Sequence, residues 1–174
     1  RILVDEVWGP DVTAQDFNVY ATPAAIAQYY NFPLPIELSA PSIALVETGL
    51  DQPNLLEALN AYRQQLGLAP MTPAQFQLIG ATNVAPNDLG ETALDISVLA
   101  GVAPNSAQYL YGSASATASE IGNFQAYQNA YFDSTRNPEI LSSSFIYFTS
   151  MTANSPFQRA WQDLFIDGML SGVS

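Results

Sequence analysis

Two carboxylates that stand four residues apart, Glu91 and Asp95, are the side chains of this sequence best placed to do acid–base chemistry. They belong to the stretch GETALDISVLA, residues 90–100, whose apolar spacing predicts a helix. On a helix they would share one face, and such a like-charge pair costs about 0.2–0.5 kcal/mol when exposed. One interpretation is a pair that shares a proton, because close approach and partial burial separate acid from base roles. The other is a solvated helix start, where negative charge is favourable.

The residue types that are missing narrow the chemistry further. The sequence contains no cysteine and no histidine. A disulfide framework, a thiol nucleophile, a Ser-His-Asp triad and a metal site built on cysteine or imidazole are therefore excluded within these residues. The sequence also has no P-loop and no G-x-G-x-x-G stretch for a nucleotide. Acid–base chemistry within this chain must therefore use carboxylates.

The charge balance is strongly acidic, with 16 Asp and Glu, four Arg and no Lys, for a formal net charge of −12. This balance argues against nucleic acid as a partner. Below about pH 4 the carboxylates protonate, so few charges remain and self-repulsion is small. We therefore interpret the composition as suited to an acidic medium, with ordinary acidic solubility as the alternative. No apolar run reaches the roughly 18 residues that a membrane span needs, so no membrane partner is expected.

The elements that must position these carboxylates alternate between strand and helix. A chain of 174 residues with 48% apolar content is expected to form one domain, residues 1–174, with an irregular arm at 1–21. A short helix should follow Thr22, which can cap it, and Pro23, which suits its first position. Four strands are then expected at 42–47, 76–80, 107–112 and 139–145, and four helices at 53–67, 88–101, 118–132 and 155–170.

This alternation predicts βαβ units, and hence an α/β, doubly wound, mostly parallel sheet covered on both faces. In such sheets ligands bind at the carboxyl ends of the strands, where loops meet the starts of helices. A fifth strand would be expected after the helix at 155–170, where the sequence stops at Ser174. We therefore expect a sheet that is incomplete without a further C-terminal segment.

Four stretches resemble a known family, in the order in which that family has them. They are TPAAIAQYYNFP (22–33), SIALVETG (42–49), GETALDISVLAGVAPNSAQYLY (90–111) and NPEILSSSF (137–145). The third is the most specific, because its Gly, Leu, Ile and Ala-Pro context is rarer than the acidic spacing alone. The sequence resembles the sedolisin family of serine-carboxyl peptidases, the acid-acting relatives of subtilisin. The resemblance implies a subtilisin-like fold and favours the proton-sharing interpretation of the carboxylate pair.

The resemblance also implies a role for each acidic residue of the pattern. Glu91 matches the general base, which takes a proton from a serine hydroxyl and later protonates the leaving amine. Asp95 matches the residue that orients that glutamate. Glu47 stands where some members have a further glutamate that is linked to the catalytic pair by hydrogen bonds, as a proton relay. The alternative for Glu47 is a charge at a loop or helix start.

Ser144 and Phe145 fall in the segment that binds substrate in the family. A hydroxyl in an ordinary strand is the alternative for Ser144. The family has glycine after the aromatic position, and that glycine lets the substrate approach the backbone. Here Ile146 takes its place. A β-branched side chain there should narrow or reshape the cleft.

The family's nucleophile motif, Gly-Thr-Ser, and the Ala-Gly-Asp motif of its oxyanion aspartate do not occur in this sequence. The family's calcium site would also lie in a C-terminal part, so no cofactor is expected in these residues. The resemblance therefore implies a secreted or otherwise acid-exposed endopeptidase. Its site would be completed, in a heterodimer, by the C-terminal chain of the same precursor. The alternatives are a non-catalytic binding protein on the same scaffold and an enzyme that uses the pair for altered chemistry.

Overall fold

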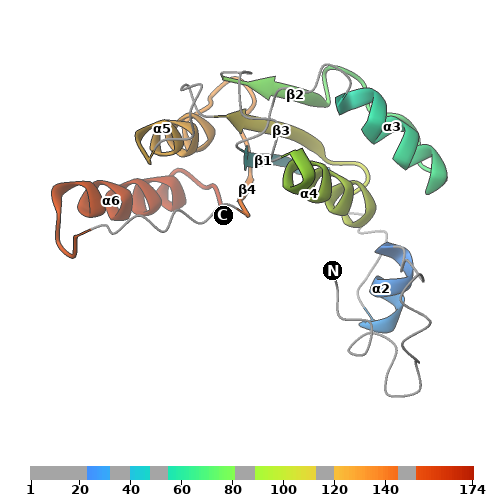
Figure 1. Ribbon diagram of the computed structural model, residues 1–174, viewed down its shortest axis with the longest axis horizontal. Coiled ribbons are helices and arrows are strands. Elements are labelled where there is room, and N and C mark those ends of the chain that lie inside the picture. Colours follow the sequence, from blue (N-terminus) through green and yellow to red (C-terminus); the bar gives the residue numbers. More distant parts are fainter. Residues whose placement is uncertain (1–22, 32–39, 48–54, 81–88, 113–119, 145–151) are drawn as a thin grey trace.

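The computed structural model describes residues 23–31, 40–47, 55–80, 89–112, 120–144 and 152–174. Its centre is a four-stranded parallel sheet with the strand order β2-β3-β1-β4 (Figure 1). The strands are β1 (Ser42–Glu47), β2 (Phe76–Ile79), β3 (Ala107–Gly112) and β4 (Ile140–Ser142). The predicted α/β class with a parallel sheet is therefore confirmed.

Five helices accompany these strands in the part of the chain that the structure describes: α2 (Pro23–Tyr29), α3 (Leu55–Gln65), α4 (Leu89–Val102), α5 (Glu120–Tyr131) and α6 (Pro156–Leu170). Their order confirms the predicted alternation. Gly67 follows α3 with a φ of 72°, the left-handed conformation that commonly ends a helix. Ser155 caps α6 by accepting a hydrogen bond from the Gln158 backbone N–H at 3.1 Å. The arm at 1–21, Thr22 and Pro53 lie outside the described residues.

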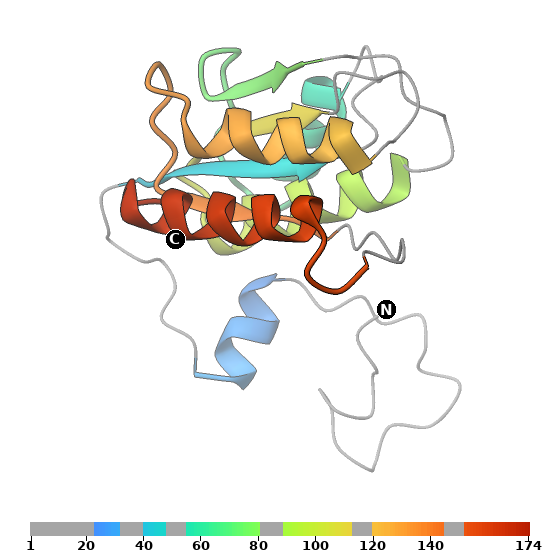
Figure 2. The same ribbon diagram turned by 90° about the vertical axis from the view of Figure 1, so that its left-hand side faces the viewer.

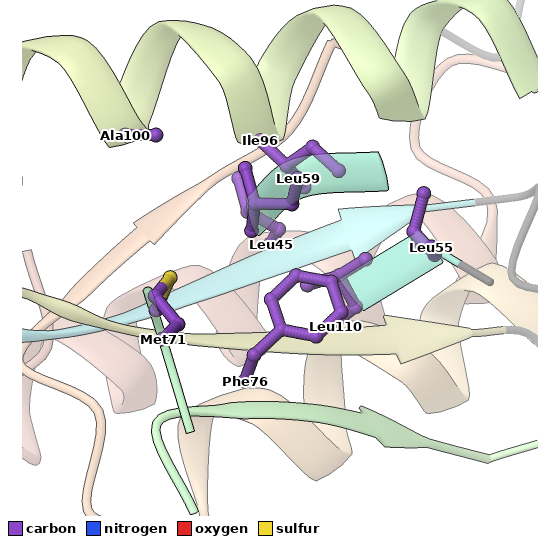
Figure 3. Close-up of a cluster of buried hydrophobic side chains, with 8 residues drawn as sticks. All are labelled: Leu45, Leu55, Leu59, Met71, Phe76, Ile96, Ala100 and Leu110. Carbon is purple, nitrogen blue, oxygen red and sulfur yellow. The ribbon is translucent and has the colours of Figure 1, made fainter. Parts of the chain in front are cut away.

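The helices cover both faces of the sheet, as Figures 1 and 2 show, with α3 and α4 on one face and α5 and α6 on the other. Alternate residues of β1 point to opposite faces, because successive side chains in a strand alternate. Leu45 belongs to the cluster under α3 and α4, whereas Ala44 and Val46 pack against α5. Figure 3 shows the first cluster: Leu45, Leu55, Leu59, Met71, Phe76, Ile96, Ala100 and Leu110.

Helix α6 packs on α5 mainly through aromatic rings. The ring of Trp161 lies 5.1 Å from that of Phe124 and 5.1 Å from that of Tyr127, both in edge-to-face geometry. Gly168 allows the close approach, because a Cβ at this position would overlap the ring of Tyr131. Within the described ranges, no helix is both long enough and apolar enough to span a membrane.

Strand β4 is shorter than the predicted range 139–145. The two serines that follow it direct their hydroxyls to other elements, and such side-chain bonds compete with a strand ladder. Ser143 Oγ donates to the backbone carbonyl of Val46 at 3.1 Å, and Ser144 Oγ donates to Asp95. The outer edge of β4 holds Ser174, whose N–H donates to the Glu139 carbonyl and whose carbonyl accepts from Leu141 N–H. These two bonds form a parallel pairing between β4 and Ser174, which follows α6 at the point of the sequence where a fifth strand was predicted.

Candidate active site

The carboxylates of the site gather where β1 ends and α4 begins. Glu47 is the last residue of β1, the strand that lies between β3 and β4, and its partner across the sheet is Gly112. Glu47 thus lies at the carboxyl end of the parallel sheet, the edge at which α/β sheets commonly bind ligands. On α4, Thr92, Ile96 and Ala100 repeat every four residues and are buried. They form the stripe that faces the sheet.

Glu47 is completely buried, with an exposed fraction of 0%. Its Oε2 accepts a hydrogen bond from Thr92 Oγ1 at 2.9 Å, whereas its Oε1 has no donor among the described residues. Burial is the main reason that the pKa of Glu47 rises to about 8. The Thr92 hydroxyl partly opposes this rise, while the charge of Asp95, its hydrogen bond and the charge of Glu91 add to it. Glu47 is therefore a neutral carboxylic acid at acidic and neutral pH.

Asp95 links this buried acid to the surface. Its carboxyl is hydrogen-bonded to that of Glu47, and two carboxyls can bond in this way only when one of them carries a proton. Its Oδ2 also accepts from Ser144 Oγ at 2.7 Å, and Ser144 is exposed. The hydrogen bonds thus run from Thr92 through Glu47 and Asp95 to Ser144. This chain joins α4, the end of β1 and the residues that follow β4.

Glu91 lies one turn before Asp95 on α4, as the sequence predicted, and is partly exposed. Its charge acts on Glu47, as does the charge of Asp95. Ser144 joins them through Asp95. Phe145 and Ile146, which complete the predicted substrate segment, lie outside the described residues. The structure brings Glu47, Asp95 and Ser144 into one network and places Glu91 beside it.

Sequence reasoning missed three further side chains of this region. Thr92 supplies the donor to Glu47, Ser143 bonds the Val46 carbonyl, and Tyr127 of α5 is hydrogen-bonded to Ser143. Burial raises the pKa of Tyr127, its Ser143 bond lowers it and the charge of Glu47 raises it. Only Thr92 left a signal in the sequence. It falls on the same four-residue repeat as two apolar residues of α4, so its hydroxyl had to be buried.

The described residues offer no group of three acidic or other ligating side chains that could hold a metal ion. The calcium site that the family resemblance implies was expected in a segment beyond these residues.

Comparisons with known proteins found a relative in sequence and a similar solved structure. Over 130 residues, or 71% of this chain, the sequence is 31% identical to kumamolisin from Bacillus sp. (strain MN-32), and the match covers 22% of that protein. The fold is similar to that of Pseudomonas sedolisin, a serine-carboxyl proteinase, solved in complex with two molecules of pseudo-iodotyrostatin. The TM-score is 0.67 at 20% identity, and the match covers 88% of this chain and 42% of that one.

No protein-family model matches the chain. The matches span about a fifth of kumamolisin and less than half of the sedolisin chain. Within those limits, the sequence match and the shared fold agree on one family. For the part of the chain that they cover, both matches support the sedolisin family of serine-carboxyl peptidases.

Proposed function

We propose that this chain supplies the glutamate and aspartate of an acid-acting serine-carboxyl endopeptidase site. The observation that carries the proposal is the gathering of Glu47, Glu91 and Asp95 at the carboxyl end of β1, where the charges of Asp95 and Glu91 act on the buried Glu47. A site that works in acid needs a base other than histidine, and this sequence contains no histidine. Carboxyl groups in contact fill that role, because their environments separate acid from base.

In the proposed mechanism Glu91 is the general base. It takes the proton from a serine hydroxyl as the serine oxygen attacks the carbonyl carbon of the scissile peptide bond. The tetrahedral intermediate then collapses, and Glu91 returns the proton to the leaving amine. Water hydrolyses the acyl-enzyme with Glu91 again as base. Asp95 orients Glu91 from one turn away, and Glu47 supplies a buried proton that Asp95 shares.

The serine and the oxyanion aspartate would come from outside these residues, from the C-terminal chain or segment of the same precursor. The outer edge of β4 supports this proposal, because Ser174 pairs there in parallel fashion and leads toward the next strand position. Apolar side chains of α6 also remain exposed, among them Ile166, Met169 and Leu170 at 56%, 72% and 80%. Such a patch is suited to packing against another segment.

The substrate of the proposed enzyme is a peptide or protein, bound near Ser144 and Phe145. Ser144 is exposed and its hydroxyl bonds Asp95, so a peptide that docks at the residues after β4 would lie next to the acidic groups. We further propose secretion or another acidic compartment as the working place. The absence of Lys and the net charge of −12 support this, because the chain would carry little charge in acid.

The test is a Glu91→Gln variant, assayed for acid proteolysis in the intact protein with every segment of its precursor. We expect a loss of about 10²–10⁴-fold in kcat, the range that general-base catalysis contributes, with an unchanged fold by circular dichroism. Glu57→Gln is the matched control, since Glu57 is an exposed glutamate on α3, and should leave activity unchanged. Undiminished acid proteolysis in Glu91→Gln would refute the role of Glu91. Proteolysis by a folded monomer of this chain alone would refute the need for a partner.

A further inference from the structure

Thr92 makes a contact that its position on a helix does not require. A threonine inside a helix commonly bonds a backbone carbonyl of the preceding turn. Here its Oγ1 lies 2.9 Å from Glu47 Oε2, a residue 45 positions earlier in the sequence. Both side chains are sealed from solvent, with exposed fractions of 1% and 0%. Thr92 also stands directly after Glu91 and three residues before Asp95, so it occupies the centre of the acidic cluster.

The direction of this bond follows from counting donors and acceptors. A protonated carboxyl has one O–H donor, and its other oxygen can only accept. Among the described residues, Oε2 is the acceptor that the Thr92 hydroxyl reaches. If Thr92 accepted from Oε2 instead, its buried O–H would lack a partner among those residues, at the cost of an unpaired donor. When Thr92 donates instead, Oε2 is the accepting oxygen. Oε1, which has no donor among the described residues, is then the oxygen that holds the proton.

We propose that Thr92 is a positioning residue that fixes which oxygen of Glu47 is protonated, and so directs the proton that Glu47 shares with Asp95. This inference rests on the proposed function, in which that shared proton supports Glu91. The titratable groups that act on Glu47 from the elements packed against β1 are Asp95 and Glu91 of α4, and the charge of Glu47 acts in turn on Tyr127 of α5. Asp95 accepts a hydrogen bond from Ser144, just as Glu47 accepts one from Thr92. A hydroxyl group therefore bonds each member of the carboxyl pair.

Infrared difference spectroscopy of the intact protein tests the bond directly, because it reads the C=O stretch of a protonated carboxyl. Carboxyl-¹³C-labelled glutamate and a Glu47→Gln difference spectrum assign the Glu47 band. We expect Thr92→Val to move this band to higher frequency, since the carbonyl loses its donor, and Thr92→Ser to leave it in place. Thr72→Val is the control, because the Thr72 hydroxyl is exposed and bonds Gln75. An unmoved Glu47 band in Thr92→Val would overturn the proposal.

The alkaline limb of the proteolysis profile, where Glu47 loses its proton, is the second readout. The Thr92 hydroxyl favours the ionised carboxylate, and a hydrogen bond to a charged group corresponds to about one pH unit or more. Thr92→Val should therefore shift this limb upward by about one unit, and Thr92→Ser should restore it. If Thr92→Val does not fold, Thr92→Cys replaces it, because a thiol is a weak donor of similar size. If Thr92→Val shifts the Glu47 band but the intact protein shows no acid proteolysis, the Thr92 bond is supported and the proposed function is refuted. A shifted band with an unmoved alkaline limb would overturn the positioning role.

Discussion

Two carboxyl groups of this protein, Glu47 and Asp133, meet opposite environments and end in opposite charge states. Glu47 is fully buried, has one hydroxyl donor and lies near two more acids, and its pKa rises to about 8. Burial also opposes ionisation of Asp133, but the hydrogen bonds that this side chain receives hold its pKa below the usual range. The surroundings of each carboxyl group therefore determine whether it is protonated or ionised.

The bonds of Asp133 account for that difference. Its Oδ1 accepts from the backbone N–H groups of Thr135 and Arg136 at 2.9 and 3.0 Å. Its Oδ2 accepts from Tyr111 Oη at 2.9 Å and Arg136 Nη1 at 2.7 Å. Arg136 in turn donates through Nε to Gln77 on β2. A carboxylate with four donors, one of them cationic, is a structural link, whereas one with a single donor among other acids is suited to proton transfer.

The largest predicted effect is the pH dependence that Glu47 imposes on stability. Below about pH 4.5 Glu47 is neutral in both the folded and the unfolded state. Between that value and its folded pKa of about 8, the unfolded state loses the proton while the folded state keeps it. The free energy of unfolding should therefore fall by about 3–5 kcal/mol as the pH rises through this window, and then level off.

Glu47→Gln should remove this part of the slope, because the amide is neutral at every pH and its oxygen can still accept from Thr92. Urea unfolding of the wild type and the variant from pH 4 to pH 9 measures the difference. Glu57→Gln, an exposed substitution on α3, should retain the wild-type slope. If Glu47→Gln and the wild type lose stability in parallel, Glu47 does not hold a proton in the folded state.

Asp133→Asn should show the opposite pH dependence, with a smaller effect. Because the folded pKa of Asp133 is depressed, its contribution is present above about pH 4 and is lost as the pH falls through the folded pKa. We expect the variant to lose about 1–3 kcal/mol at pH 7, since hydrogen bonds to a charged group are removed. The difference in the free energy of unfolding between the wild type and the variant should narrow at about pH 2. Asp163→Asn on exposed α6 is the control, and a gap that widens in acid would contradict the prediction.

The sequence predicted the fold better than it predicted either network. Local apolar spacing was enough for β1 and α4, and Glu91 and Asp95 were found because one helical turn relates them. The bonds that tie the site together span larger separations: 45 residues for Thr92 to Glu47 and 49 for Ser144 to Asp95. Such pairs depend on how α4 sits on the sheet, and spacing along the chain does not contain that information.

The smallest predicted effect is that of a substitution at Tyr111. It distinguishes the contribution of the Tyr111 hydroxyl to the Asp133 network from that of the Arg136 guanidinium. Tyr111 is buried, with an exposed fraction of 1%, and burial followed by its bond to Asp133 raises its pKa. Tyr111→Phe keeps the packing and removes one donor, while Arg136 still holds the same carboxylate oxygen. We therefore expect a loss of about 1 kcal/mol at pH 7, measured by urea unfolding. A double-mutant cycle with Asp133→Asn should give a coupling energy of similar size. Strictly additive effects of the two substitutions would mean that the hydroxyl and the carboxylate do not stabilise each other, and that the Asp133 charge depends on Arg136 and the backbone alone.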